Sequence, residues 1–149
     1  MPYGFRISAR AFGLAVPVHF SWEMSQANAF TGMPREVWAA TAACAFASLG
    51  DGLLTLLILA GGAAAFRSWT WFDARLPGRW ALVGILSFGV AVVTEWVLVY
   101  ELHRWGYATS MPLIPGLRVG LLPVLQMVLL SPLVLRWASL PPGEWCHQS

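Results

Sequence analysis

Long apolar stretches alternate with short polar segments along the chain, and four of these stretches are candidates to cross a membrane. They cover residues 11–30, 37–66, 80–102 and 113–138. A spanning helix needs about 20 mostly apolar residues to cross a hydrocarbon core roughly 30 Å thick, and the last three stretches meet this requirement. The first stretch is weaker, because Pro17, His19 and Glu23 interrupt its apolar run. We therefore expect an all-α fold in which residues 1–149 form one domain, an integral membrane bundle of four transmembrane helices.

The N-terminal stretch has a second interpretation as a secretory signal. Arg6 and Arg10 precede its apolar run, and the Ala-Asn-Ala segment 27–29 is similar to the small-residue site at which such signals are cleaved. The apolar run is short, however, and Pro17 and His19 break it. These interruptions favour a membrane helix over a cleaved signal.

Composition supports the membrane interpretation and excludes several soluble classes. The chain is 58% hydrophobic and only 11% charged, with a mean hydropathy of +0.64, whereas soluble domains carry about 25% charged residues. This charge content is too low for a cytosolic globule, a coiled coil or a disordered chain. The nine basic residues are all Arg and are scattered along the chain, and the net charge is +2. No nucleic-acid partner is therefore expected.

The distribution of Arg residues predicts the orientation of the bundle. With four spans, the N-terminus, the second loop and the C-terminus share one side of the membrane. Six Arg residues lie on that side: Arg6, Arg10, Arg67, Arg75, Arg79 and Arg136. Three lie on the other side: Arg35, Arg104 and Arg118. By the positive-inside rule both termini are expected in the cytoplasm.

Tryptophan residues are expected to mark the two interfaces of the membrane. Six of them lie near the predicted ends of the spans: Trp38, Trp69, Trp71, Trp80, Trp105 and Trp137. Aromatic belts at the level of the lipid head groups are typical of membrane proteins.

Polar side chains inside the predicted spans are the main candidates for function, because an ionisable group at the bilayer centre costs about 2.5–3.5 kcal/mol. Seven polar residues fall in the non-cytoplasmic half of the bundle: Glu23, Gln26, Glu95, Glu101, Arg104, Tyr107 and Gln126. Asp51 is predicted to lie deeper, near the middle of its span. Since four helices contribute to one layer, we expect a polar chamber that opens outward or into the outer leaflet.

Within this chamber, Asp51 and Glu95 are the candidate catalytic residues, and the other members are candidate ligand contacts. A carboxyl group that is buried beside another one can retain its proton near neutral pH and act as an acid. The structural alternative is that these groups only join helices by hydrogen bonds. Glu101 and Arg104, spaced i, i+3, are also expected to form an interfacial ion pair.

A metal site is a weaker alternative, and we expect neither a metal nor another cofactor. His19 and His103 lie on different predicted helices, and together with Glu23 and Glu95 they offer ligands of the right chemical type. The chain contains no Gly-rich phosphate loop, nucleophile elbow or CxxC motif.

Several motifs resemble those of a family of small, uncharacterised bacterial four-helix integral membrane proteins. The first group is Trp22-Glu23-x-x-Gln26, Leu49-Gly50-Asp51 and Glu95-Trp96. The second group is Arg104-Trp105-x-Tyr107 with Met111-Pro112, and Gly120-Leu121-x-Pro123-x-x-Gln126 with Pro132. The similarity runs from about Trp22 to Pro132, with departures at residues 27–30 and at Arg118. It implies four helices in a bacterial inner membrane and no particular reaction.

Three functional hypotheses follow from these observations. The first is the binding or acid-catalysed conversion of a lipid-like ligand, such as an isoprenoid or a quinone. The second is an accessory or assembly subunit of a larger membrane complex or a homo-oligomer. The third is a small transporter, although four helices make a poor alternating-access machine unless they dimerise. In each case membrane lipids are direct partners.

Overall fold

The structure, a computed structural model, describes residues 3–72 and 77–140. Four long helices dominate this part of the chain: α1 (Tyr3–Gln26), α2 (Val37–Phe66), α3 (Pro77–Trp96) and α4 (Leu121–Ser139). The shorter elements are the 3₁₀ turn η1 (Ala27–Ala29), strand β1 (Phe30–Thr31), the π-helical segment η2 (Val97–Glu101) and strand β2 (Gly106–Tyr107). The fold is therefore all-α apart from one pair of two-residue strands.

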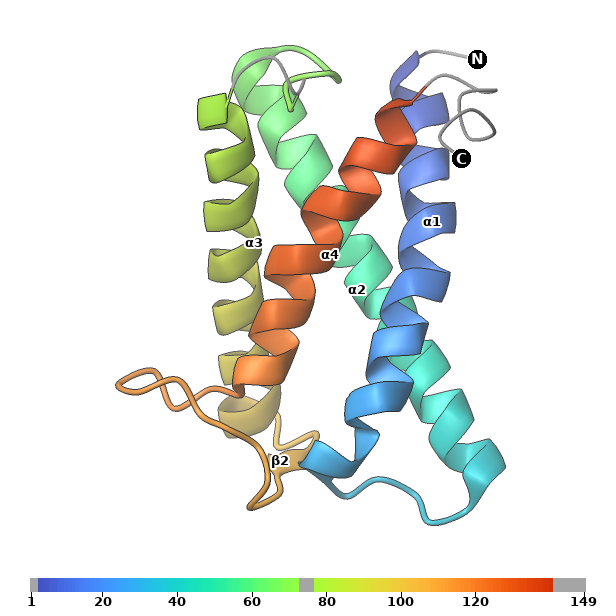
Figure 1. Ribbon diagram of the computed structural model, residues 1–149, viewed down its shortest axis with the longest axis vertical. Coiled ribbons are helices and arrows are strands. Elements are labelled where there is room, and N and C mark those ends of the chain that lie inside the picture. Colours follow the sequence, from blue (N-terminus) through green and yellow to red (C-terminus); the bar gives the residue numbers. More distant parts are fainter. Residues whose placement is uncertain (1–2, 73–76, 141–149) are drawn as a thin grey trace, which may run out of the picture.

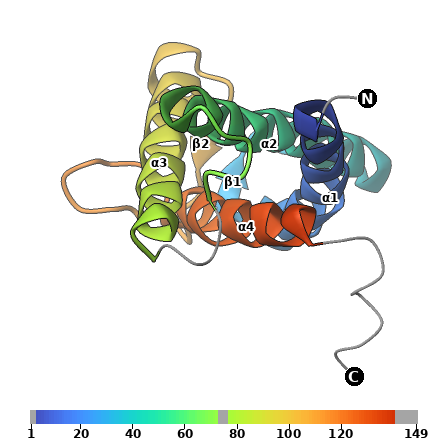
Figure 2. The ribbon, with the colours of Figure 1, turned by 90° about the horizontal axis from the view of Figure 1, so that it is seen from above.

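The helices form a bundle in which α1 packs along α2 and α4, and α3 packs along α4 (Figure 1). Viewed along the bundle, α1 and α3 lie on opposite sides, and α2 and α4 lie between them (Figure 2). The helices α2 and α3 touch each other much less. They approach where α2 ends and α3 begins, and they diverge toward β1 and β2 (Figure 1).

The first helix differs from the predicted span 11–30 at both ends. It begins at Tyr3, because its early residues already face the bundle: Ile7 and Ala11 are buried. It ends at Gln26, because the chain then turns through η1 into β1, which pairs antiparallel with β2. The strand pair ties the end of α1 to the segment that follows α3.

The predicted span 113–138 is wrong at its start, because residues 113–120 form a loop and α4 begins only at Leu121. Backbone geometry explains the error. Gly116 and Arg118 have positive φ angles of 82° and 60°, which a helix does not allow. The loop closes on itself through the hydrogen bond from the Ile114 amide to the Val119 carbonyl, 2.9 Å long. Apolar composition alone does not distinguish such a loop from a helix.

Three helices in the described part of the chain are long and apolar enough to cross a membrane: Val37–Phe66, Gly78–Glu101 and Leu121–Ser139. The 24-residue α1 has a similar length but a more polar composition. Its buried positions follow each other at helical spacing along one face: Gly4, Ile7, Ala11, Ala15, His19, Glu23 and Gln26. This helix therefore turns one continuous face toward the bundle along its whole length.

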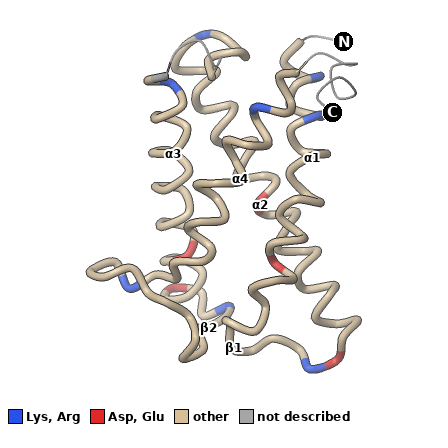
Figure 3. Tube along the Cα trace, in the orientation of Figure 1, with Lys and Arg blue, Asp and Glu red and all other residues tan. Residues whose placement is uncertain are grey.

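The two ends of the bundle differ in charge (Figure 3). One end holds the start of α1, the end of α2 and the end of α4; we call it the Arg-rich end. Its described basic residues are Arg6, Arg10, Arg67, Arg79 and Arg136, while Arg75 lies outside the described residues. The opposite end carries β1 and β2 and is called the strand end; it holds Arg35, Arg104 and Arg118. The described acidic residues lie between the middle of the bundle and the strand end (Figure 3).

The half of the bundle near the Arg-rich end is packed with apolar side chains. Leu59, Trp71, Val83 and Leu135 are all fully buried there. Trp71, which was expected in an interfacial belt, thus faces the interior of the bundle rather than its outer surface. Its Nε1 donates a hydrogen bond of 3.0 Å to the Leu59 carbonyl, and its ring lies so close to Gly62 that a Cβ there would come within 1.9 Å of it. The ring packs inside the bundle because Gly62 leaves room for it.

Candidate functional site

A network of polar side chains lies in the half of the bundle near the strand end, with Gln126 of α4 at its centre. The Gln126 side chain is 1% exposed. Its Nε2 donates to Asp51 Oδ2 of α2 at 2.8 Å, and its Oε1 accepts a 2.8 Å hydrogen bond from Gln26 Nε2 of α1. One amide therefore joins three helices.

On α1, the i, i+3 pair predicted from the sequence is part of the same network. Gln26 Nε2 lies 3.2 Å from Glu23 Oε1, and Gln26 Oε1 accepts a 3.1 Å hydrogen bond from the Trp22 indole. The Glu23 carboxyl group also interacts with the carboxyl group of Asp51. Both acids are thus part of one network with the Gln26 and Gln126 amides.

A second layer of polar groups lies deeper in the bundle, and sequence reasoning missed most of it. His19 is fully buried; its Nδ1 lies 3.0 Å from Gln126 Nε2, and its Nε2 lies 3.4 Å from Thr55 Oγ1. Thr55 Oγ1 in turn lies 3.3 Å from Ser131 Oγ and donates to the Asp51 carbonyl at 3.0 Å. The available signal was the i, i+4 spacing of Asp51 and Thr55, which places both on one face of α2.

Glu95 approaches the network from α3, immediately before the π-helical segment. Its side chain is 6% exposed, and its Oε2 accepts a 2.6 Å hydrogen bond from the Tyr107 hydroxyl. Burial raises the pKa of the Tyr107 phenol, and the hydrogen bond to Glu95 raises the pKa further, so the hydroxyl remains a donor.

Two features of the strand end place the Tyr107 ring. Tyr107 pairs with Phe30 in the antiparallel strands. Its ring also lies against Gly120, where an added Cβ would come within 2.9 Å of Tyr107 Cε1. The glycine of the Gly120-Leu121 motif is therefore required for close packing rather than for a flexible hinge.

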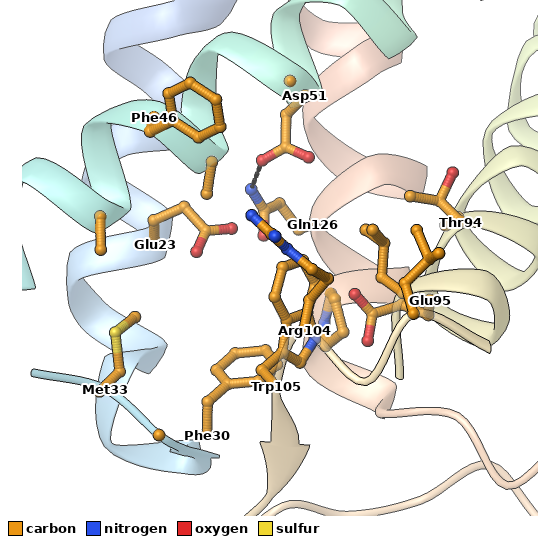
Figure 4. A pocket seen from close by; sticks show the side chains of 18 of the residues that line it. Glu23, Phe30, Met33, Phe46, Asp51, Thr94, Glu95, Arg104, Trp105 and Gln126 are labelled. Carbon is orange, nitrogen blue, oxygen red and sulfur yellow. Dashed lines mark hydrogen bonds between the residues drawn. The ribbon is translucent and has the colours of Figure 1, made fainter. Parts of the chain in front are cut away.

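A cavity of about 770 Å³ lies between these polar groups and the diverging helices α2 and α3 (Figure 4). Glu23, Asp51, Glu95 and Gln126 form its polar wall. Its other walls are mostly apolar and come from α2, α3, α4 and the β1 segment: Phe30, Phe46, Leu53, Leu98, Leu102 and Met127. The side chains of Phe46, Leu53 and Leu102 are 75%, 60% and 58% exposed, so the cavity opens at the outer surface of the bundle.

Arg104 and Trp105 enter this cavity from the loop that follows η2 (Figure 4). The Arg104 side chain makes no hydrogen bond or ion pair with any residue of 3–72 or 77–140. The Trp105 side chain interacts with the Glu95 carboxyl group, and its ring packs edge-on against Phe30 at 6.2 Å. The strand end therefore presents the unpaired guanidinium of Arg104 and the ring of Trp105 to the cavity.

The predicted ion pair between Glu101 and Arg104 does not form. Glu101 is exposed and does not line the cavity. Within the described ranges, the basic and acidic side chains that lie within 4 Å of each other are His19 and Asp51, at 3.8 Å. The helix ends at Glu101, and the Arg104 amide binds back to the Leu98 carbonyl, so the helical i, i+3 relationship is lost.

The weaker metal hypothesis finds no geometric support in the residues described. No group of three or more His, Cys, Asp and Glu side chains among them is placed to hold a metal ion. His103 is exposed, and its Nδ1 lies 3.1 Å from the Val99 carbonyl rather than near His19.

The site thus combines three carboxyl groups, two amides and a free guanidinium on an apolar cavity, which suits it to hold a polar group or to move a proton. Comparison with known proteins adds no identity: no family model, curated protein or solved structure matches the chain. The resemblance to a bacterial membrane-protein family remains a prediction.

Proposed function

We propose that this chain is a multi-pass protein of a bacterial inner membrane, with α1 as a fourth transmembrane helix and both termini in the cytoplasm. Support for the fourth span comes from the length of α1 and from its packing along α2 and α4. Support for the orientation comes from the five described Arg residues at the Arg-rich end against three at the strand end.

Reporter fusions test this orientation. A fluorescent protein fused after Ser149 should be fluorescent, and alkaline phosphatase fused at the same position should be inactive. Phosphatase inserted beside Arg35 should be active, since this exposed loop lies at the opposite end. Strong phosphatase activity at Ser149 would contradict the orientation.

The function that the geometry supports best is the binding of a lipid-like ligand, such as an isoprenoid or a quinone, in the cavity near the strand end. One observation carries this proposal: a cavity of about 770 Å³ has apolar walls, a polar base and exposed apolar residues at its opening. Ligand sites measure about 300–1,000 Å³ and combine such walls with a few placed polar groups. An opening edged by Phe46 and Leu53 would face acyl chains in a membrane.

The carboxyl groups also suit acid catalysis on such a ligand. Asp51 or Glu95 would transfer a proton to a carbon–carbon double bond, and the electron pair of that bond would form the new C–H bond. A carboxylate would then remove a proton from the neighbouring carbon and restore the double bond in a new position. This isomerisation needs no co-reactant, because the proton is returned.

A cavity-filling substitution tests ligand binding. Ala47 of α2 lines the cavity, so Ala47→Phe should remove co-purifying lipid from the protein, as measured by native mass spectrometry and lipid extraction. Ala45→Phe is the matched control, because Ala45 lies on the same helix, is exposed and does not line the cavity. Equal lipid content in both variants and the unchanged chain would contradict the proposal.

The accessory-subunit hypothesis remains the second candidate, and the exposed apolar faces of α2 and α3 are the observation that favours it. Leu57, Ile85 and Val93 are 58%, 66% and 63% exposed, and either lipid or a protein partner would cover them. A transporter is less favoured, because the polar network ends at Ser131 and the fully buried Leu59, Val134 and Leu135 close the bundle beyond it.

A further inference from the structure

The cavity contains an excess of groups that attract positive charge. Glu23, Asp51 and Glu95 come from three different helices and all line it. Their hydrogen bonds to neutral side chains use Oε1 of Glu23, Oδ2 of Asp51 and Oε2 of Glu95. In the parts of the chain described, no Arg side chain lies within 4 Å of these carboxyl groups, and the basic group that does is His19, whose Nδ1 lies 3.8 Å from Asp51 Oδ2.

Uncompensated carboxylates are costly in such surroundings. Moving an ionised carboxyl group out of water costs several kcal/mol unless a counter-charge and hydrogen bonds accompany it. A positively charged group placed in the cavity would supply that counter-charge to each acid that is ionised. A phosphate would instead be repelled by each ionised acid.

Aromatic rings provide a second and independent feature for a cation. Phe30 and Trp105 both line the cavity and pack edge to face, with ring centroids 6.2 Å apart. Tyr107 lies 6.1 Å from Phe30 and donates its hydroxyl to Glu95. Clusters of aromatic rings beside carboxylates are a recurrent way of binding ammonium groups, because the ring faces carry negative potential.

Arg104 lines the same cavity but does not neutralise its acids. Its side chain is drawn among the lining residues (Figure 4), and it has no hydrogen-bond or ion-pair partner among residues 3–72 and 77–140. The loop position of Arg104 after η2 leaves the side chain exposed, so it is not locked there by packing.

We infer that the cavity binds a lipid-like molecule by a positively charged end, an amine or ammonium group, and that the Arg104 guanidinium, which lines the same cavity without pairing with its acids, opposes this binding. This inference rests on the proposed ligand-binding function and specifies the chemistry of the ligand. Glu23, Asp51 and Glu95 attract the charged end, and the apolar walls hold the chain attached to it.

Three amphiphiles of equal chain length test the inference on the full chain in nonionic maltoside micelles. They are dodecyltrimethylammonium, dodecanol and dodecyl phosphate, and their dissociation constants are measured by native mass spectrometry and tryptophan fluorescence. Each dissociation constant is expressed as the concentration of the ligand within the micelle, so that differences in partition do not enter the comparison. We expect the ammonium compound to bind about tenfold more tightly than dodecanol, a difference of roughly 1.4 kcal/mol.

The variants should respond according to charge. Asp51→Asn and Glu95→Gln should each weaken ammonium binding about tenfold and leave dodecanol binding unchanged, whereas Arg104→Gln should tighten ammonium binding severalfold. Glu36→Gln and Arg118→Gln are matched controls and should change neither, since both residues are exposed at the strand end and do not line the cavity.

The outcomes separate this inference from the proposed function. Tightest binding of dodecyl phosphate, lost in Arg104→Gln, would identify Arg104 as an anchor for anions and overturn the inference. Equal binding of dodecanol and the ammonium compound, both lost in Ala47→Phe, would overturn the charge preference and retain the ligand cavity. No binding of any of the three compounds would overturn both.

Discussion

The two halves of the bundle follow different rules of packing. Toward the Arg-rich end, Leu59, Trp71, Val83 and Leu135 fill the space between the helices completely. Toward the strand end, α2 and α3 diverge, a cavity remains, and its wall carries three carboxyl groups. The same four helices therefore form a closed apolar core in one half and an open polar site in the other.

This difference indicates how the molecule separates stability from function. The apolar half needs no hydrogen-bonded network to hold the helices together, because burial and dispersion provide the attraction. The polar half is less closely packed, and each of its buried polar groups needs a hydrogen-bond partner. The predictions below test whether the two halves can be damaged independently.

The largest expected effect is a loss of stability on replacing Trp71. Trp71→Ala removes a fully buried ring and its hydrogen bond to Leu59, and it should lower the free energy of unfolding by about 3–5 kcal/mol. Thermal melting in detergent measures the change, and lipid content of the folded fraction should stay the same. Trp38→Ala is the control, because Trp38 is 75% exposed. Loss of lipid at unchanged melting would contradict the division between the halves.

An intermediate effect is expected at the centre of the polar network. Gln126→Leu leaves the Asp51 carboxyl and the Gln26 amide without their shared partner, and it should cost about 1–3 kcal/mol as well as ligand retention. Ser131→Ala removes only the last hydroxyl of the network and should have a smaller effect on melting and none on lipid content. If Ser131→Ala were as damaging as Gln126→Leu, the network would extend further toward the apolar half than we infer.

The smallest effect on stability is expected for Glu95→Gln, which should nevertheless abolish ligand retention or activity. The amide oxygen of Gln still accepts the Tyr107 hydroxyl, and a neutral amide is cheaper to bury than an unpaired carboxylate. It lacks, however, the proton that acid chemistry transfers and the charge that attracts a cation. Melting temperature and co-purified lipid should be measured on the same preparation.

Tyr107→Phe is the companion variant for this test. It removes the hydroxyl that holds Glu95 and should lower stability by about 1 kcal/mol while reducing ligand retention only in part. Lowered melting of Glu95→Gln with unchanged lipid content would identify a structural role for Glu95. That result would favour the accessory-subunit hypothesis.

The sequence predicted the helical class, the approximate position of the second and third spans, and the gathering of polar groups in one half. These features depend on local composition and on residue order. The length of an apolar stretch identifies a candidate span, and because successive spans alternate in direction, each loop is assigned to one end of the bundle. Counting residues along each helix at about 1.5 Å per residue placed Glu23 and Gln126 in one layer and Asp51 deeper, whereas the structure brings Asp51 into direct contact with Gln126.

Other features were decided by tertiary structure alone. Residues 113–120 are as apolar as a helix, yet the positive φ angles at Gly116 and Arg118 close them into a loop. The partner of Glu95 is Tyr107, because the strand pair and Gly120 bring that ring to it. Composition does not contain this information, since it depends on how distant segments meet.

The cavity is the clearest case of this division. The types of residue that line it were evident in the sequence. Its existence, however, depends on the divergence of α2 from α3, because α2 packs against α1 and α3 packs against α4. The rotation of each helix about its axis likewise brings His19, Thr55 and Ser131 together into a chain of polar contacts that begins at Gln126. Local sequence determined which groups are polar and approximately at what depth along each helix they lie. The crossing of the helices determined which of these groups meet. Contacts between helices depend on the rotation of each helix and on the crossing angle rather than on spacing along one chain.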